Sequence, residues 1–257
     1  MTDLPTAAIC LIGDELLSGR TRDINVQTIA RYLKPFGIPV REVRIVPDEQ
    51  ERIVAAVNAL RAAYTYVFTT GGIGPTHDDI TADAIGAAFG VPVEEDPEAV
   101  ALLAARYAAM ETEFTPARRR MTRVPKGASL ISNPVSGAPG FQTGNVFTLA
   151  GVPQIVEGML DDIGHRLQTG QVVEAITIRG AGLREGDLAE PLREMARKHD
   201  TLSLGSYPWF RSPQDHGVAL VARGVDRTSL NAAADDLEAL VQSLGVSPER
   251  FVGEPNA

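Results

Sequence analysis

The sequence has one cysteine, no long apolar run and no excess of positive charge, and each absence excludes a class of protein. Cys10 is the only cysteine among 257 residues, which rules out an intramolecular disulfide and a zinc site built from several thiolates. It lies in the apolar run from Ala7 to Ile12, a position typical of a buried core residue.

The missing apolar runs and the acidic balance exclude further classes. No stretch approaches the roughly 20 apolar residues of a membrane span, and the N-terminus carries Asp3 where a signal peptide carries positive charge. The formal net charge of −9 disfavours broad capture of nucleic acid or an anionic membrane. We therefore expect a soluble, cytoplasmic, globular protein, with two domains favoured over one.

One short segment departs from the acidic balance. The only basic cluster consists of Arg118, Arg119, Arg120, Arg123 and Lys126. A solvated helix face and a local phosphate-binding patch both explain such a run, and the sequence leaves the two open.

The first 90 residues alternate short apolar runs with amphipathic segments. This pattern predicts strands at 7–12, 38–46 and 64–69 and helices at 23–36, 49–63 and 76–89. Asp48 is expected to cap the second of these helices. Repeated β-α units with short connections predict a doubly wound α/β domain, whose ligand would lie beyond the carboxyl ends of the strands.

The remainder predicts the rest of this domain and a second, smaller one. Residues 96–121 are alanine-rich and helical, with Pro97 and Pro116 at first turns. Residues 124–145 are rich in proline and glycine and indicate loops around one short strand. A strand at 146–149 and a helix at 153–167 close a domain over 1–170. The order β-α-β-β-α then predicts a small α+β domain over 171–257, with strands at 174–179, 201–207 and 217–225 and helices at 185–198 and 226–244.

The stretch TTGGIGPTHDDIT, residues 69–81, combines a glycine-rich turn with two carboxylates. Its glycines allow close approach to a ligand, and Pro75-Thr76 leads into a predicted helix whose free N–H groups attract anions. Asp78 and Asp79 either offset the helix dipole or hold Mg²⁺ against the ligand's phosphates. For His77, a surface or hydrogen-bonding role is favoured over metal binding.

Extended further, the run TTGGIGPTHDDITADAI resembles the signature of the MoaB/Mog molybdopterin-binding family, and its GPTxDDxT form is similar to the N-terminal region of CinA, the competence/damage-inducible proteins. The resemblance covers almost the whole chain, because further segments follow the family's order: IGDELLSGRTRDIN, VPDEQERI, LISNPVSGAPGF, LAGVPQIVEGM, TIRGAGLREGDLAEPL and LSLGSYPWF. It implies a three-layer MoaB/Mog-like domain followed by a small CinA-type domain. Many CinA proteins carry a further C-terminal deamidase domain, to which the resemblance of these segments does not extend, so that activity is not implied.

The resemblance also implies a chemistry and a site. A CinA-like protein would use Mg²⁺ or another divalent cation to hydrolyse a nucleotide diphosphate such as ADP-ribose. The alternatives are adenylyl transfer to molybdopterin in molybdenum cofactor biosynthesis, binding of molybdopterin or a nucleotide without catalysis, or a scaffold role. We expect a homo-oligomer, a dimer or trimer, that binds neither nucleic acid nor membrane.

The resemblance assigns each predicted role to the residues of this sequence that match the family's motifs. The catalytic residues are Asp79 and Asp48, and the metal ligands are Asp79, Asp78 and Asp14. Two family positions differ, with Gly137 in place of threonine and Ala150 in place of proline, so one hydroxyl that could touch phosphate is missing. The predicted ligand-binding residues are Gly13, Asp14, Glu15, Gly71, Gly72, Gly74, Pro75, Thr76, Thr81, Ser136, Gly137, Pro139 and Gly140.

Overall fold

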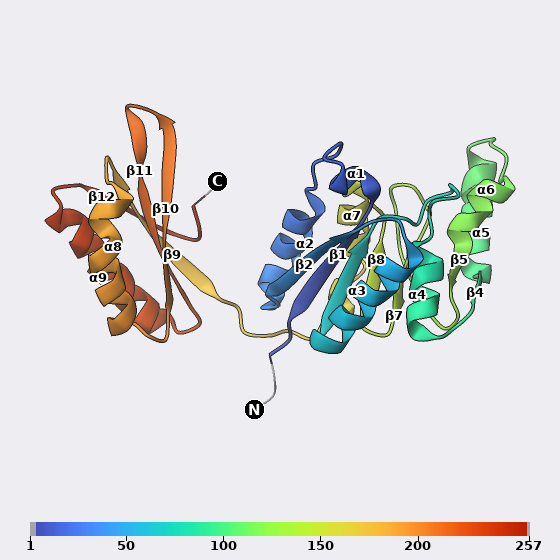
Figure 1. Ribbon diagram of the computed structural model, residues 1–257, viewed down its shortest axis with the longest axis horizontal. Helices are drawn as coiled ribbons and strands as arrows, with labels where there is room; N and C mark the ends of the chain where they lie inside the picture. The colour runs from blue at the N-terminus through green and yellow to red at the C-terminus, as the bar shows by residue number, and fades with distance from the viewer. Residues whose placement is uncertain (1–3, 256–257) are drawn as a thin grey trace. The chain divides into compact units, whose positions relative to one another are not determined.

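The computed structural model describes residues 4–255, which fold into two compact units that meet in sequence between Gly170 and Gln171 (Figure 1). Buried apolar side chains form separate clusters within each unit. Among the described residues, no helix is long and apolar enough to cross a membrane.

The first unit is built on a six-stranded sheet of order β2-β1-β3-β8-β7-β6. Neighbouring strands are parallel from β2 to β8, while β7 is antiparallel to both of its neighbours. Every residue of β1, β3 and β8 is buried, as expected for central parallel strands covered on both faces. The strands are β1 (Ala7–Ile12), β2 (Val40–Val46), β3 (Tyr66–Thr70), β6 (Ser129–Ile131), β7 (Gly140–Thr143) and β8 (Val146–Leu149).

Helices cover both faces of this sheet. Alternate residues of β1 divide between two cores, because side chains in a strand point to opposite faces. Ile9 packs with α2 (Asn25–Leu33) and α7 (Pro153–Leu160), whereas Cys10 packs with α3 (Gln50–Ala63) and α4 (Thr81–Phe89). Burial raises the pKa of the Cys10 thiol to about 12. The predicted three-layer doubly wound arrangement is confirmed.

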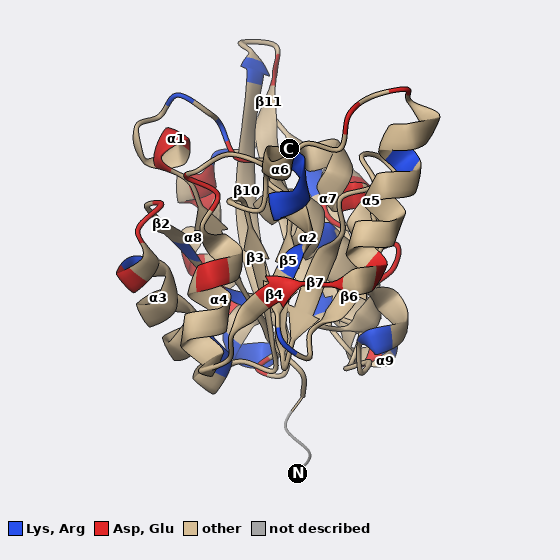
Figure 2. Cartoon of the chain, turned by 90° about the vertical axis from the view of Figure 1, so that its right-hand side faces the viewer, with Lys and Arg blue, Asp and Glu red and all other residues tan. Residues whose placement is uncertain are grey.

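Smaller elements complete the first unit. A two-stranded sheet pairs β4 (Val93–Glu95) with β5 (Arg123–Pro125). Figure 2 shows acidic β4 beside a basic segment of β5. The remaining helices are α1 (Asp14–Leu17), α5 (Pro97–Ala109), α6 (Pro116–Arg119) and the 3-10 helices η1 (Lys34–Phe36), η2 (Arg120–Thr122) and η3 (Gly164–Arg166).

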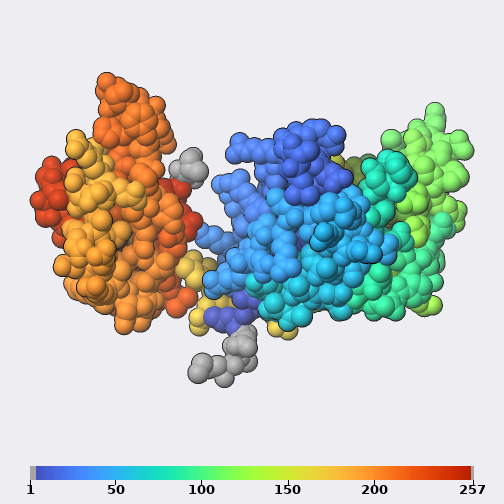
Figure 3. Space-filling model, viewed as in Figure 1, coloured from blue at the N-terminus to red at the C-terminus, as the bar shows by residue number. Residues whose placement is uncertain are grey.

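The second unit is an antiparallel sheet of order β10-β11-β9-β12 with two helices on one face. The helices bury Leu188 and Leu237 against Ile178 and Leu220 of the sheet, so the predicted small α+β fold is confirmed. The hairpin of β10 and β11 projects beyond the helices of its unit (Figures 1 and 3). The elements are β9 (Glu174–Ala181), α8 (Glu185–Lys198), β10 (Ser203–Ser212), β11 (Asp215–Gly224), α9 (Arg227–Ser243) and β12 (Pro248–Val252).

Several predicted boundaries are wrong. The helix expected from residue 76 begins only at Thr81, and the helix expected to reach residue 167 ends at Leu160. The proline-rich segment forms β5, β6 and β7 rather than one strand, and neither β4 nor β12 was expected. Short strands with few apolar residues leave little periodicity to recognise. Asp48 does not cap α3: the cap position is Glu49, and no side chain bonds the helix start there.

Candidate functional site

A cavity of about 620 Å³ opens at the carboxyl ends of the parallel strands of the first unit. Its walls come from the segments that follow β1, β2, β3, β6 and β8, which is where doubly wound sheets place their ligands. The volume lies within the range of about 300–1,000 Å³ typical of small-molecule sites. The lining residues are Ile12, Gly13, Glu15, Thr21, Asp48, Gly71, Gly72, Ile73, Gly74, Pro75, Thr76, Asp78, Asp79, Met121, Asn133, Ser136, Ala138, Ala150, Gly151, Val152, Pro153 and Ile155.

The glycine-rich loop forms one wall and is held from behind by Thr81. The Thr81 hydroxyl donates to the Gly71 carbonyl at 2.9 Å, and its N–H donates to the Gly72 carbonyl at 2.9 Å. Gly72 has φ +66°, and a Cβ there would lie 2.2 Å from the Thr81 hydroxyl oxygen. Thr81 is fully buried and does not line the cavity, so the structure places this predicted ligand contact behind the loop as a support.

Asp79 closes the turn that follows the glycines. One carboxylate oxygen, Oδ2, accepts from the Thr76 N–H at 2.7 Å and from the Thr76 hydroxyl. Asp78 also lines the cavity, and hydrogen bonding from Thr76 lowers the pKa of its carboxyl. Because α4 begins only at Thr81, the first-turn dipole role considered for Asp78 and Asp79 is wrong. His77 is exposed and lies beside Asp78, with 4.0 Å between Nδ1 and Oδ1.

Asp48 connects the ends of the first two strands. Its Oδ2 accepts a hydrogen bond from the Asp14 N–H at 3.0 Å, which replaces the helix cap expected from sequence. Partial burial raises the pKa of the Asp48 carboxyl, and the nearby charges of Asp14, Glu15 and Asp78 raise it further, against the Asp14 hydrogen bond. All the charged groups that shift this pKa are carboxylates, so the site gathers negative charge at one end of the cavity.

An all-oxygen donor set of this kind fits a hard divalent cation. Within residues 4–255, no group of three or more His, Cys, Asp or Glu side chains is arranged to hold a metal ion by itself. Mg²⁺ often takes only one or two carboxylates and completes its shell with water and substrate phosphates. Asp48, Asp78 and Asp79, which line the cavity, could therefore supply one or two of the oxygen ligands of such a cation.

The segment after β6 is organised by Asn133, which the sequence reasoning missed. The buried Asn133 amide donates from Nδ2 to the Ser136 hydroxyl at 2.6 Å and to the Ala138 carbonyl at 2.7 Å. Its Oδ1 accepts from the N–H groups of Val135 and Ser136, each at 3.1 Å. Its Asn-Pro dipeptide, typical of turn initiation, was the available signal.

The predicted residues near Asn133 divide into two groups. Ser136 lines the cavity, whereas Gly137, Pro139 and Gly140 do not. Gly137 has φ +82°, and a Cβ there would lie 2.4 Å from Cδ of Arg106. Arg106 in turn donates to the Val135 carbonyl at 2.6 Å. The Arg106 side chain therefore occupies the space that a side chain at position 137 would need.

The loop after β1 contributes both predicted and unpredicted residues. Gly13 and Glu15 line the cavity, but Asp14 does not and acts through its N–H on Asp48. Thr21 also lines the cavity and was not predicted. Asn25, on α2, donates from Nδ2 to the Gly151 carbonyl at 2.8 Å and so positions the segment after β8.

Most of the basic cluster is engaged in local pairs. Arg119 pairs with Glu95 at 2.7 Å, and Arg123 pairs with Asp83 at 2.7 Å. Lys126 lies 3.7 Å from Glu94, and Arg118 lies over the Tyr107 ring. Arg120 differs: it lines a narrow cavity with Asp79 and the glycine loop, and its buried Nε has no hydrogen-bond partner among the described residues.

Fold and cavity together define a doubly wound α/β protein with a cavity at the carboxyl ends of its parallel strands, where proteins of this class bind ligands. Residues 8–169 match the family described as "Probable molybdopterin binding domain", and residues 180–249 match "FAD synthase, middle domain". The first match spans more than half of the chain. The chain belongs to this molybdopterin-binding family, as a CinA-like member of MoaB/Mog type, which confirms the identification made from sequence.

Similar proteins support this assignment. A CinA-like protein of Citrifermentans bemidjiense is 35% identical over 237 residues, which cover 90% of this chain and 56% of that protein. A protein of Pyrobaculum calidifontis is 35% identical over 215 residues, covering 80% of this chain and 81% of that protein. The solved structure of CinA from Thermoplasma acidophilum, described as of unknown function, has a TM-score of 0.59 at 29% identity and covers 64% of this chain and 99% of that chain. This chain thus spans just over half the length of the CinA-like relative.

Proposed function

We propose that the cavity of the first unit binds a nucleotide diphosphate and catalyses metal-dependent hydrolysis of its phosphoanhydride bond. The observation that carries the proposal is Asp48, a partly buried carboxyl with a raised pKa that lines the same cavity as the glycine-rich loop. A carboxylate made more basic by its surroundings is suited to accept a proton during catalysis. Membership of a probable molybdopterin-binding family also makes a pterin phosphate a candidate ligand.

Backbone groups of the glycine-rich loop provide the anion-binding half of the site. The N–H groups of Gly72, Ile73 and Gly74 have no hydrogen-bond partner among residues 4–255, and all three residues line the cavity. Unpaired N–H groups fixed in position stabilise charge that develops on phosphoryl oxygens. The Asp79–Thr76 bonds hold the following turn so that these groups keep their direction.

Asp48 would act on the attacking water. The water oxygen bonds to one phosphorus while its proton passes to Asp48, and the bond from that phosphorus to the bridging oxygen breaks, which leaves two phosphate products. Asp78 and the second oxygen of Asp79 are the residues that would hold a divalent cation, whose charge offsets that of the phosphates. Asp14 holds Asp48 in place through its N–H.

The test is incubation of the purified protein with ADP-ribose and Mg²⁺, Mn²⁺ or Co²⁺, with AMP release measured by chromatography. We expect turnover that falls at least about a hundredfold in Asp48→Asn, the lower range for loss of a general base. Asp187→Asn, on exposed α8 of the other unit, is the matched control and should leave turnover unchanged.

Calorimetry with the same ligands distinguishes a protein that binds without catalysis from one that does not bind these ligands. Saturable binding without any hydrolysis of ADP-ribose, FAD or related diphosphates would contradict the enzymatic proposal and leave a binding protein. Gly72→Val, which would drive a side chain into Thr81, should abolish binding. No binding of any nucleotide or pterin would overturn the ligand assignment as well.

A further inference from the structure

The second unit carries a cavity of its own, on the sheet face opposite its helices. The cavity measures about 530 Å³ and is lined by aromatic and arginine side chains of the sheet. Alternate residues explain the difference between the faces: Leu220 of β11 packs into the helix-covered core, whereas its neighbours Ala219 and Val221 point the other way. This volume also falls in the range of small-molecule sites, about 300–1,000 Å³.

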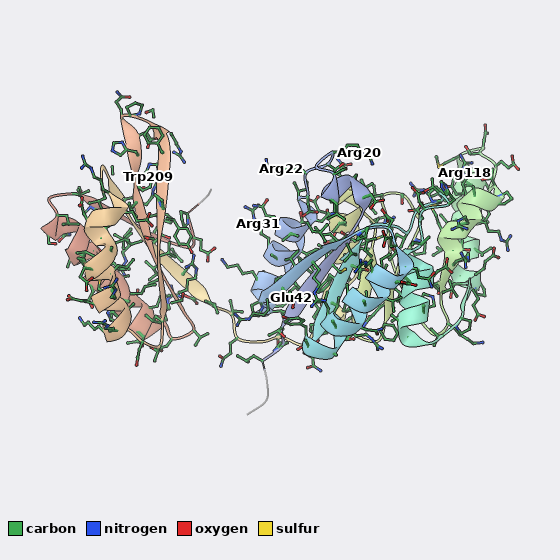
Figure 4. The ribbon with its side chains drawn as sticks, viewed as in Figure 1. Arg20, Arg22, Arg31, Glu42, Arg118 and Trp209 are labelled. Carbon is green, nitrogen blue, oxygen red and sulfur yellow. The ribbon has the colours of Figure 1, made fainter. Side chains whose placement is uncertain are left out.

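Aromatic side chains are concentrated on this hairpin although the chain has few of them. Only 5% of the residues are aromatic and one is tryptophan, yet Tyr207, Trp209 and Phe210 all line this cavity. Tyr207 is 44% exposed, whereas the ring of Phe210, the next residue but two along the strand, lies beside His216 with 6.1 Å between the ring centroids. Figure 4 shows Trp209 on the projecting hairpin. Exposed aromatic rings that border a cavity are typical of a surface that a ligand covers.

Arginine guanidinium groups lie over two of these rings. Cζ of Arg179 lies 4.3 Å from the centroid of the Trp209 ring, and Cζ of Arg223 lies 5.0 Å from that of Tyr207. Arg223 also donates to the Tyr207 hydroxyl at 2.7 Å. A third arginine, Arg211, lines the cavity with a side chain that is 63% exposed.

The arginines keep donors for a ligand. Their acidic neighbours are Asp215, 3.6 Å from Arg211, Glu249, 3.8 Å from Arg179, and Glu254, 2.6 Å from Arg223. A guanidinium has five N–H donors in a rigid fork, and one carboxylate accepts at most two of them in a bidentate pair. The cavity therefore offers planar rings and directed cationic donors together.

We propose that this cavity binds a nucleoside phosphate, with the base stacked on the exposed aromatic rings and the phosphate bound by Arg211 and Arg223. Stacking is open to any base, because every base has a π-face, and arginine strengthens it. Glu254, which lines the cavity, and the net charge of −9 favour a small ligand over a nucleic-acid strand, whose binding relies on an extended positive groove. The site belongs to the second unit and does not depend on the function proposed for the first.

Trp209 makes this proposal directly measurable, because it is the only tryptophan. The whole protein is titrated with AMP, with adenosine, with inorganic phosphate and with a short single-stranded oligonucleotide while tryptophan fluorescence is recorded. We expect AMP to change the fluorescence saturably, adenosine to bind at least about tenfold more weakly, and phosphate alone to cause no saturable change.

Variants test the assignment of the residues. Tyr207→Leu and Arg211→Gln should each weaken AMP binding about tenfold, from the loss of one stacking ring or one charged hydrogen bond. Arg193→Gln, on exposed α8 of the same unit, is the matched control and should bind as the natural protein does. Asp48→Asn, in the first unit, should leave the tryptophan signal unchanged.

Three outcomes would overturn the proposal. The first is no saturable fluorescence change with AMP, and the second is a change that Tyr207→Leu and Arg211→Gln do not alter. The third is an oligonucleotide that binds more tightly than AMP and occupies several nucleotides, which would assign the surface to single-stranded nucleic acid. Arg211 is exposed and should not be required for folding, so its variant remains informative if Tyr207→Leu unfolds.

Discussion

Replacement of Asn133 by alanine should destabilise the first unit and loosen one wall of its cavity. Asn133 is only 6% exposed, and its amide makes two donor and two acceptor bonds to the segment from Val135 to Ala138. Alanine removes all four. The partners Ser136 and Ala138 line the cavity, so the same change should weaken ligand binding.

The magnitude follows from these bonds. A typical intramolecular hydrogen bond contributes about 1 kcal/mol net, and an unsatisfied buried partner costs about 1–3 kcal/mol. Some freed groups will bind water because the cavity is open, so we expect the free energy of unfolding to fall by about 2–4 kcal/mol. Asn133→Asp is the informative comparison. Its oxygens can still accept from the two N–H groups, but a carboxylate cannot donate to the Ala138 carbonyl.

The two units must be followed separately, because a single unfolding free energy is not defined when units unfold independently. The only tryptophan, Trp209, lies in the second unit. Tryptophan fluorescence during urea unfolding therefore reports the second unit, and circular dichroism reports both. We expect Asn133→Ala to shift the circular dichroism midpoint while the tryptophan midpoint stays where it is.

Two results would refute this reasoning. A change of less than about 0.5 kcal/mol, which is the usual range for surface substitutions, would mean that the four bonds do not stabilise the segment. A destabilised variant with unchanged ligand affinity would mean that the segment does not form a wall of the binding site. Asn133→Asp should recover partly at low pH, since a protonated carboxyl can donate one hydrogen bond.

Two further predictions concern Asp48 and Gly137. Because the pKa of Asp48 is raised in the folded state, its ionisation opposes folding, and stability should fall as pH rises through that pKa. Asp48→Asn should therefore raise the melting temperature of the first unit near pH 7, and the gain should disappear below the ordinary carboxyl pKa of about 4; an equal gain at both pH values would contradict the assignment. Gly137→Thr should cost at least about 1 kcal/mol, because φ is +82° and the new Cβ would meet Arg106. In an Arg106→Ala background the penalty in urea unfolding should be smaller, and simple additivity of the two changes would show that the contact does not limit the substitution.

The sequence predicted the parts of the fold that have strong periodicity. Buried strands such as β1 and β3 contain only apolar residues and threonine, and long helices such as α3 and α8 were placed within one or two residues of their observed bounds. Short strands were not predicted, because three or five residues are too few to show an alternation of apolar and polar side chains. The sequence of β4 is Val-Glu-Glu, and that of β12 is Pro-Glu-Arg-Phe-Val. For β12, only pairing with β9 makes the segment a strand.

The sequence predicted the location of the cavity better than the contacts that its residues make. Parallel strands bring Gly13, Asp48 and Gly71 to one edge, which follows from topology alone. The roles of Thr81 and Asn133 depend on side-chain direction: the first turns into the loop and the second into its own segment. Sequence spacing does not specify these directions. The conformation of the turn around each residue decides where its side chain points.

The buried thiol of Cys10 gives the first unit a kinetic reporter. Burial in the central strand raises the pKa of this thiol to about 12, and only the thiolate reacts quickly with alkylating or disulfide reagents. Modification therefore requires the layer of α3 and α4 to lift from β1. The rate of thiol labelling under native conditions would measure how often that layer opens, and its slowing by bound nucleotide would report how far the ligand at the carboxyl edge couples to the centre of the sheet.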